Sequence, residues 1–298
     1  MIRILIICLL SMSLNANLLE RDDVKKFIDM AVEESNLTRE EIINYIKYAQ
    51  PSQKAVELRS NQPEVKATWD SYRSKRVTDT RILNGVNFIN ENADIFNKVE
   101  KDYGVSKFYI ASIIGLETNY GGYLGSFNPL DTIFTRAFDP DSKFWQRELV
   151  ELLVLSKRYD LNPKEIKSSW SGAIGLGQFI PSSYNAYGVD YDYDGYVDLL
   201  NSKMDGIASV ANFLKVHGWK SNQPAAAQVE LSEEYRNLND EQIDKLVLPF
   251  KINNFRTKVS SDVLNEAGFN ISTNQNDDLT PLLDRKSTRL NSSHQIIS

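Results

Sequence analysis

The stretch TRILNGVNFINENADIFNKVEKDYG, residues 80–104, decides the fold class. Its apolar residues recur at spacings of three and four, and they are Ile82, Val86, Ile89, Ala93, Phe96 and Val99. This spacing puts them on one face of a helix, and the glycine at position 104 is a common helix stop. A strand would alternate apolar and polar residues instead. The stretch therefore predicts an amphipathic helix whose apolar face packs on a core.

Segments on both sides of this stretch show the same helical periodicity. Residues 36–51 place Thr38 three positions before Glu41, which is the spacing of a capping box, and the segment stops at Pro51. Apolar residues with helical spacing also fill residues 107–121, 144–160 and 204–218. No comparable set of alternating strands is found, so the sequence predicts a mainly α fold.

The composition limits the class of protein. The 298 residues are 42% hydrophobic, which is enough to bury a core in one large domain or two small ones. The net charge of -6 argues against nucleic acid or an anionic membrane surface as the main partner, because both reward a basic patch. Only two histidines, His217 and His294, are present, which argues against a catalytic triad or a multi-histidine zinc site.

Residues 1–16, MIRILIICLLSMSLNA, are expected to be a signal peptide. Arg3 precedes an apolar run, and small or polar residues precede Ala16, as in secretory signals. The run is too short to span a bilayer, so no transmembrane segment is expected in the mature chain. The only cysteine, Cys8, follows an isoleucine rather than a small residue, which disfavours a lipid anchor. A buried amino-terminal strand is the alternative interpretation of this segment.

Glu117 is the candidate for acid–base chemistry. It follows Ile113 by four residues and Ile114 by three, so on a helix it shares their inward face near the carboxyl end. Burial and the helix dipole would both oppose ionisation there and would raise the pKa of its carboxyl group. A raised pKa suits a general acid that works near neutral pH. The alternative is a glutamate that turns to solvent or pairs with a neighbouring arginine.

The glycine-rich loop SGAIGLGQFIPSSY, residues 171–184, is a candidate binding segment. Repeated glycines let the backbone run beside a bulky ligand, and Gln178 can both donate and accept hydrogen bonds, as sugar hydroxyl and acetamido groups require. A phosphate-binding loop would need a lysine followed by a serine or threonine directly after its last glycine, and that pair is absent here. Carbohydrate or peptide binding is therefore favoured over nucleotide binding, with tight helix packing as the alternative.

Residues 190–205, DYDYDGYVDLLNSKMD, match the first half of a calcium-binding loop. The ligands at positions one, three, five and seven would be Asp190, Asp192, Asp194 and the carbonyl of Tyr196. Position twelve is Asn201 rather than glutamate, so Asp205 is the candidate for the remaining ligand. An acidic solvated turn is the alternative, but calcium is favoured because a cation removes the cost of concentrating three negative charges.

The segments IIGLETNYGGYLG, SGAIGLGQFIPSSYNAYGVDYDYDGYVDL and DGIASVANFLKVHGW resemble the lytic murein transglycosylase B family. The resemblance runs from about Phe27 to Leu283. It implies a lysozyme-like, α-rich core at about residues 86–222, accessory regions that complete a domain of residues 17–283, and an EF-hand-like calcium loop. Residues 284–298 depart from the family, which has a further Tyr-Asn segment and a closing helix, and they are expected to be read-through sequence.

The resemblance implies that Glu117 is the single general acid and base of a periplasmic enzyme. The enzyme would cleave the β-1,4 bond between N-acetylmuramic acid and N-acetylglucosamine and form a 1,6-anhydromuramoyl product. Ordinary glycosidases use two carboxylates, whereas no second acid accompanies Glu117 in ETNYGG. The implied substrate-binding residues are Tyr120, Ser169, Gln178 and Phe179, and the implied metal is a structural Ca²⁺ held by the five residues named above.

Two other functions remain open at this stage. A hydrolytic muramidase on the same fold would use a water molecule beside Glu117 and would leave a reducing end. A non-catalytic scaffold that binds peptidoglycan would give Glu117 only a structural part. No organic cofactor and no nucleic acid partner are expected, and a monomer would suffice for either enzyme.

Overall fold

The computed structural model describes residues 18–60, 69–138, 142–221, 229–231, 242 and 269–271. The expected signal peptide and the expected read-through tail lie outside these residues. The chain divides into two compact units, residues 1–219 with 292–294 and residues 220–291 with 295–298. In the second unit, β1 (Val229–Leu231) pairs with β2 (Phe269–Ile271) as an antiparallel ribbon.

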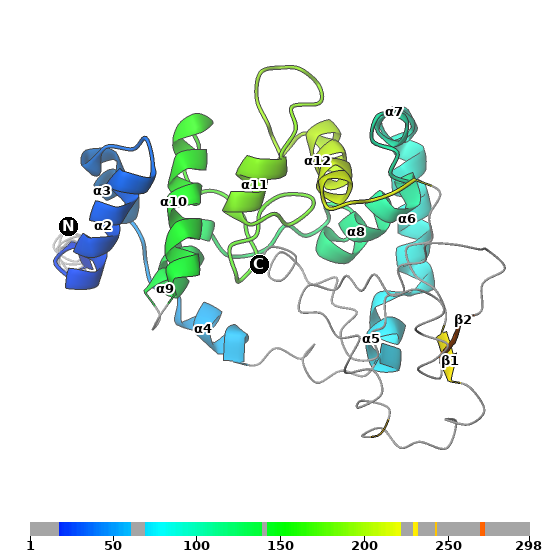
Figure 1. Cartoon of the computed structure of the whole chain (residues 1–298), viewed down its shortest axis with the longest axis horizontal. Helices are drawn as coiled ribbons and strands as arrows, with labels where there is room; N and C mark the ends of the chain where they lie inside the picture. The colour runs from blue at the N-terminus through cyan, green and yellow to red at the C-terminus, as the bar shows by residue number, and fades with distance from the viewer. Residues whose placement is uncertain are drawn as a thin grey trace, which may run out of the picture. The chain divides into compact units, whose positions relative to one another are not determined.

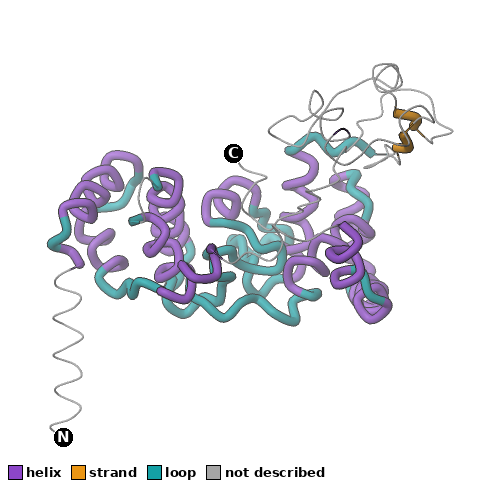
Figure 2. Tube along the Cα trace, turned by 90° about the horizontal axis from the view of Figure 1, so that it is seen from below, coloured by secondary structure: helices purple, strands orange, loops and turns teal. Residues whose placement is uncertain are grey.

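The described part of the first unit is built from helices (Figure 1). They are α2 (Asp22–Glu34), α3 (Arg39–Ile46), α4 (Gln53–Ser60), α5 (Trp69–Arg76), α6 (Asp79–Glu91), α7 (Ala93–Tyr103), α8 (Lys107–Thr118), α9 (Pro129–Ala137), α10 (Lys143–Arg158), α11 (Pro181–Tyr187) and α12 (Lys203–Val216). Helix is the predominant element along the described trace, and loops connect the helices (Figure 2). The predicted mainly α fold is confirmed. Among the described helices, none is both long and apolar enough to cross a bilayer.

The stretch at residues 80–104 forms two helices, so the prediction of one continuous helix is wrong. α6 ends at Glu91 and α7 begins at Ala93, with Asn92 between them at φ -121 and ψ 31. The Nδ2 atom of Asn92 donates a hydrogen bond of 2.7 Å to the carbonyl of Phe88. Asparagine side chains compete for backbone groups in this way and end helices. The periodicity did not predict this break, because the spacing of the apolar residues continues across Asn92.

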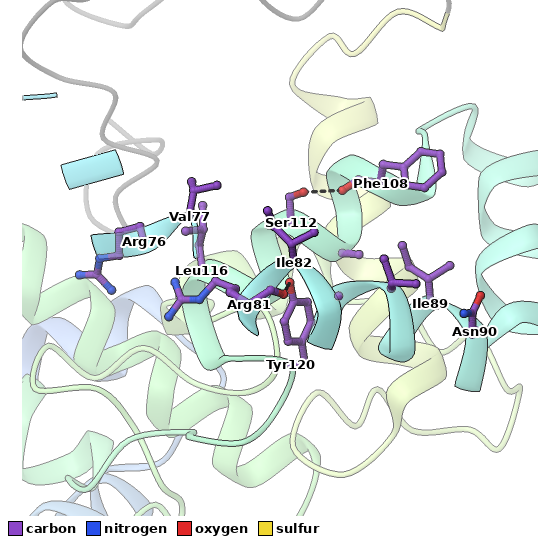
Figure 3. Close-up of a pocket in the computed structure, with 13 residues that line it drawn as sticks. Arg76, Val77, Arg81, Ile82, Ile89, Asn90, Phe108, Ser112, Leu116 and Tyr120 are labelled. Carbon is purple, nitrogen blue, oxygen red and sulfur yellow. Dashed lines mark hydrogen bonds between the residues drawn. The ribbon is translucent and has the colours of Figure 1, made fainter. Parts of the chain in front are cut away.

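The apolar face of this stretch also divides at the break. Phe96 and Val99 on α7 are fully buried, as predicted. Ile82 and Val86 on α6 are 54% and 49% exposed, so α6 turns part of its apolar surface away from the core. That exposed surface lines a pocket of about 310 Å³ between α6 and α8 (Figure 3).

The predicted capping box at the start of α3 is confirmed. The amide of Glu41 donates to Oγ1 of Thr38 at 3.2 Å, and the amide of Thr38 donates to Oε2 of Glu41 at 2.7 Å. Two backbone donors at the helix start are thereby satisfied. The helix ends at Ile46, earlier than the predicted stop at Pro51.

α8 packs against α6, α7 and α12 in the first unit. Ile110 and Ile114 on α8 are fully buried, as are Ile207 and Ala208 on α12. α8 is therefore held on several sides by neighbouring helices. α9 and α10 pack against each other.

Candidate active site

Glu117 is the second-last residue of α8 and is partly buried. After Thr118 the backbone leaves the helix through two left-handed residues, Asn119 at φ 50 and Tyr120 at φ 61. The sequence predicted this position near the helix end. Backbone carbonyls gather at the carboxyl end of a helix and favour a neutral over a negative side chain there. The role of Glu117 as general acid and base stays a prediction.

Thr118 connects the end of α8 to the glycine-rich loop. Its side chain is buried, and Oγ1 lies 3.0 Å from the carbonyl of Leu176 and 3.1 Å from the carbonyl of Ile114. The same oxygen accepts a hydrogen bond of 3.0 Å from the amide of Gly121. Glu117 is thus held beside the loop that the sequence marked as a candidate binding segment.

We expect Thr118→Val to loosen this connection. Valine has nearly the same shape but cannot bond to Leu176 or Gly121, and each buried group left unsatisfied costs about 1–3 kcal/mol. Urea unfolding should show a loss in that range, together with reduced activity. The matched control is Thr80→Val at an exposed site on α6, which should change neither. Equal stability and activity for the two variants would contradict this account of the connection.

Ser169 organises the start of the glycine-rich loop. Its Oγ accepts hydrogen bonds from the amides of Ala173 at 3.1 Å and Ser171 at 3.3 Å, and it pairs with the hydroxyl of Ser171 at 2.9 Å. Isolated bridges run from Phe127 to residue 168, then to residue 174, and then to residue 179. The backbone of this loop is therefore fixed by hydrogen bonds to neighbouring backbone segments.

Gln178 and Phe179 are both turned inward in this structure. Gln178 is 6% exposed, and its Nε2 donates to the carbonyl of Gly175 at 3.0 Å. Phe179 is 5% exposed and packs edge-on against Phe213, with ring centroids 6.0 Å apart. Both side chains stabilise the loop from inside. Contact of either side chain with a sugar stays a prediction.

Tyr120 fills the space between α6 and α8. Its hydroxyl donates to the carbonyl of Arg81 at 2.9 Å. A Cβ atom added at Gly85 or at Gly115 would lie 2.5 Å from the Tyr120 side chain, so both helices need glycine there. This close packing of Tyr120 on the two glycines was not predicted, although a glycine inside a helical pattern is a signal of close packing. Tyr120 thus anchors the turn after Glu117, and its contact with substrate stays a prediction.

Two acids on α9 and α10, Asp131 and Glu148, have structural partners. The carboxylate of Asp131 accepts hydrogen bonds from Nζ of Lys164 at 2.8 and 2.9 Å and from the amide of Gln50 at 2.6 Å. Glu148 is 2% exposed and accepts hydrogen bonds from the amide and the hydroxyl of Ser182 at 3.0 and 2.6 Å. Burial raises the pKa of the Glu148 carboxyl, and the bonds to Ser182 oppose that rise. Glu148 therefore holds the start of α11.

The predicted calcium loop brings three carboxylates together. Asp190, Asp192 and Asp194 each offer an oxygen, and these atoms lie within 4.8 Å of one another. The amide of Gly195, at φ 95, donates to Asp190 at 3.0 Å and shapes the turn. Carboxylate oxygens at this spacing suit a hard cation such as Ca²⁺. The residues present therefore fit the metal that the sequence predicted.

Asp205 lies outside this cluster of three aspartates. It is fully buried, and its two oxygens accept hydrogen bonds from the amides of Tyr191 at 2.8 Å and Asp198 at 2.7 Å. Burial raises the pKa of this carboxyl, and these hydrogen bonds oppose the rise. Asp205 therefore closes the two ends of the loop through these hydrogen bonds, and the direct ligand role predicted for it stays a prediction.

The predicted calcium loop and the glycine-rich loop are joined at Leu199. The amide of Leu176 donates to the carbonyl of Leu199 at 3.1 Å, and a Cβ atom at Gly175 would lie 2.3 Å from that carbonyl. The hydroxyl of Tyr184 also accepts from the amide of Leu199 at 3.0 Å. The two loops are therefore held together by direct backbone and side-chain bonds at Leu199.

Comparison with known proteins gives consistent matches. Residues 20–280 match the model of the transglycosylase SLT domain. Membrane-bound lytic murein transglycosylase B of Escherichia coli (strain K12) is 31% identical over 226 residues, which are 72% of this chain and 62% of that protein. The chain thus spans somewhat less than two thirds of the length of this relative.

Two solved structures are informative. The Escherichia coli lytic transglycosylase Slt35 in complex with calcium is 30% identical, with a TM-score of 0.70, over 90% of this chain and 78% of that chain. SltB3 of Pseudomonas aeruginosa in complex with NAG-anhNAM-pentapeptide is 29% identical, with a TM-score of 0.64, over 70% of this chain and 56% of that chain. With a family model that matches most of its length, this chain belongs to the transglycosylase SLT domain family.

Proposed function

We propose that this protein is a peptidoglycan lytic transglycosylase that cleaves the bond between N-acetylmuramic acid and N-acetylglucosamine. The observation that carries the proposal is the placement of Glu117 at the end of α8, bonded through Thr118 to the glycine-rich loop. Membership of the transglycosylase SLT domain family supports it, as does the named activity of the relative in Escherichia coli.

In the proposed reaction, Glu117 acts first as acid and then as base. Its carboxyl group gives a proton to the glycosidic oxygen, and the bond from that oxygen to C1 of the muramoyl residue breaks. The carboxylate then removes the proton of the C6 hydroxyl, and O6 bonds to C1. Glu117 regains the proton that it gave, and no water is consumed. The product is a 1,6-anhydromuramoyl end.

A single carboxylate is sufficient for this sequence because the substrate supplies its own nucleophile. Retaining and inverting glycosidases need a second acid near the bond. Asp131 and Glu148 are engaged with Lys164 and Ser182, which supports assigning them structural tasks. The complex of SltB3 with NAG-anhNAM-pentapeptide supports an anhydro product for the family.

We assign a substrate contact to Ser169. It lies just before the glycine-rich loop and is partly exposed, so a sugar can approach it. Tyr120, Gln178 and Phe179 would act mainly by fixing the walls of the site. Because murein lies outside the cytoplasmic membrane, the proposed activity implies export to the periplasm.

Digestion of purified sacculi tests the proposed function. Wild-type protein should release soluble muropeptides, and Glu117→Gln should release them at a rate lower by about 10³-fold or more while still binding to sacculi. Release of fragments at the wild-type rate by Glu117→Gln would reject Glu117 as the acid. Binding without any release by the wild-type protein would reject an enzyme and favour the scaffold alternative.

Calcium is the metal that we propose for the loop. Asp190, Asp192 and Asp194 would hold it, with the backbone carbonyl of Tyr196 as a further ligand. The ion would supply positive charge that neutralises the three carboxylates and fixes the loop. The calcium complex of Slt35 supports this choice. Asp205 would contribute by closing the loop through Tyr191 and Asp198.

We expect a chelator to lower the stability of the protein. A ligand that binds only the folded state stabilises it by about 2.7 kcal/mol at one hundred times its dissociation constant. Thermal unfolding of the wild type should therefore shift down when a chelator is added and recover when calcium is restored. The double variant Asp190→Asn with Asp192→Asn should show no such shift. An unchanged wild-type melting temperature would reject the metal site.

A further inference from the structure

Arg136, on α9, lies against two tryptophan side chains. Its Cζ atom lies 3.8 Å from the ring centroid of Trp145 on α10 and 5.1 Å from the ring centroid of Trp170. The Nε and Nη1 atoms of Arg136 are buried. A guanidinium group is attracted to the face of an indole ring, and its flat shape lets it stack there. Arg136 therefore connects α9 and α10 to the segment that leads into the glycine-rich loop.

α9 supports this segment at a second point. A Cβ atom added at Gly172 would lie 2.4 Å from Cγ1 of Ile133, so Gly172 packs directly against that side chain. Ile133 and Arg136 are three residues apart on α9 and therefore share one face of the helix. The same face of α9 thus contacts the segment at Gly172 and at Trp170.

Residues 169–173 form a turn, the Ser169 turn, which carries the hydroxyl group of Ser169. The amide of Gly172 donates to the carbonyl of Ser169 at 3.0 Å, and the amide of Ser169 donates to the carbonyl of Ala173 at 2.9 Å. Oγ of Ser169 accepts from the amides of Ser171 and Ala173, so its proton is left for Ser171 Oγ or for a ligand. These bonds orient the hydroxyl within the turn. The contacts with α9 hold the turn itself.

Trp170 is the residue through which Arg136 reaches this hydroxyl. It directly follows Ser169 in the turn and is only partly buried, so packing alone does not enclose its indole ring. The attraction of the guanidinium group favours one position of the ring. A ring held in one position also restrains the backbone that it shares with Ser169.

We propose that Arg136 is a positioning residue that sets the Ser169 hydroxyl for contact with the substrate. It acts through Trp170 and the Ser169 turn, and it neither touches the sugar nor moves a proton. The inference rests on the proposed function, which gives Ser169 a sugar to contact. A contact of this kind binds the strand equally well before and during cleavage. Its loss should therefore raise KM and leave kcat nearly unchanged.

Kinetics on soluble, un-cross-linked murein strands tests the proposal. Arg136→Met should raise KM about 10-fold, which corresponds to one hydrogen bond, and should keep kcat within about 2-fold of the wild type. Arg136→Lys keeps the charge and should recover part of the loss, and it gives the same comparison if Arg136→Met does not fold. Arg147→Met is the matched control, because the Arg147 side chain on α10 is 70% exposed. It should keep the wild-type KM.

A double-mutant cycle separates positioning from a merely structural part. In the Ser169→Ala background, Arg136→Met should raise KM by less than about 2-fold more, because the hydroxyl that Arg136 positions is already absent. Equal losses for Arg136→Met in both backgrounds would overturn the proposal. An unchanged KM in the wild-type background would also overturn it, and so would a fall in kcat of about 10-fold or more.

Fluorine NMR of protein labelled with 5-fluorotryptophan tests the contact without any substrate. The variants Trp145→Phe, Trp170→Phe and Trp219→Phe assign the resonances of these three residues. Arg136→Met should shift the resonances of Trp145 and Trp170 and leave that of Trp219 in place. Arg147→Met should shift none of them. A Trp170 resonance that does not move in Arg136→Met would contradict the positioning role.

Strand binding distinguishes failure of this inference from failure of the proposed function. Calorimetry with the same strands, in the Glu117→Gln background where cleavage is slow, should show a Kd about 10-fold higher when Arg136→Met is added. This result does not depend on cleavage. If the wild type cleaves no strand but Arg136→Met weakens binding, the proposed function is rejected and the positioning role is kept. If the wild type cleaves strands and Arg136→Met binds them equally well, the positioning role alone is rejected.

Discussion

Glu117→Gln is expected to lower activity on murein by about 10³-fold or more while the protein stays folded. General acid–base catalysis by one side chain contributes about 10²–10⁴-fold, and here the same carboxyl group would act in both steps. Glutamine keeps the size of the side chain but can neither give nor take the proton. Thermal unfolding should therefore match the wild type, and binding to sacculi should persist.

The control for this variant is Glu91→Gln. Glu91 is exposed and is the last residue of α6, and Glu117 is the second-last residue of α8. The Glu91→Gln variant therefore removes one carboxylate from a comparable position. Its activity should equal that of the wild type. A Glu117→Gln protein that retains more than about a tenth of wild-type activity would contradict the assignment of Glu117 as the single acid and base. A loss of less than about 10-fold is smaller than the contribution of about 10²-fold that is the lower bound for general acid–base catalysis.

Gly125→Ala is expected to have the largest effect on stability. Gly125 has φ 106, a conformation that costs other residues about 1–3 kcal/mol. A Cβ atom there would also lie 1.9 Å from the backbone carbonyl oxygen of Ser168, which cannot move without breaking the pairing of Ser168 with Phe127. Forced overpacking adds about 1–3 kcal/mol. We expect a loss of about 3 kcal/mol or more in the free energy of unfolding.

Gly195→Ala separates the cost of the positive φ from the cost of the steric contact with Ser168. Gly195 has φ 95, but a Cβ atom added there would meet no atom within 4 Å. Measured with a chelator present, it should lose only the conformational part, about 1–2 kcal/mol. Urea unfolding of both variants gives the comparison. Similar losses for the two would show that the contact with Ser168 is not the cause.

Much of the fold followed from helical spacing, because that signal reports directly which residues face a core. The fully buried Phe96, Val99, Ile110 and Ile114 all belong to segments with that spacing. The break at Asn92 did not follow, since a one-residue interruption leaves the spacing intact. The exposure of Ile82 and Val86 was equally hidden, because periodicity cannot tell a core face from the wall of a pocket.

The candidate site was predictable where residue type alone carries the chemistry. Glu117 and the three clustered aspartates stand out by charge and spacing. The supporting contacts did not stand out, because they join segments far apart in sequence. Thr118 bonds to Leu176 and Glu148 bonds to Ser182, and only the folded chain brings these pairs together. The inward turn of Gln178 had a different cause, because a bond from a side chain to the backbone of its own loop leaves no periodic signal in the sequence.

The chemical nature of the new chain ends tests the central claim most directly. Sacculi digested by the wild-type protein should yield muropeptides whose muramoyl ends are lighter by one water than reducing ends. Digestion in water enriched in heavy oxygen should leave those ends unlabelled, because O6 of the sugar closes the ring. Reducing ends that carry the heavy oxygen would contradict the account and would identify the protein as a hydrolase.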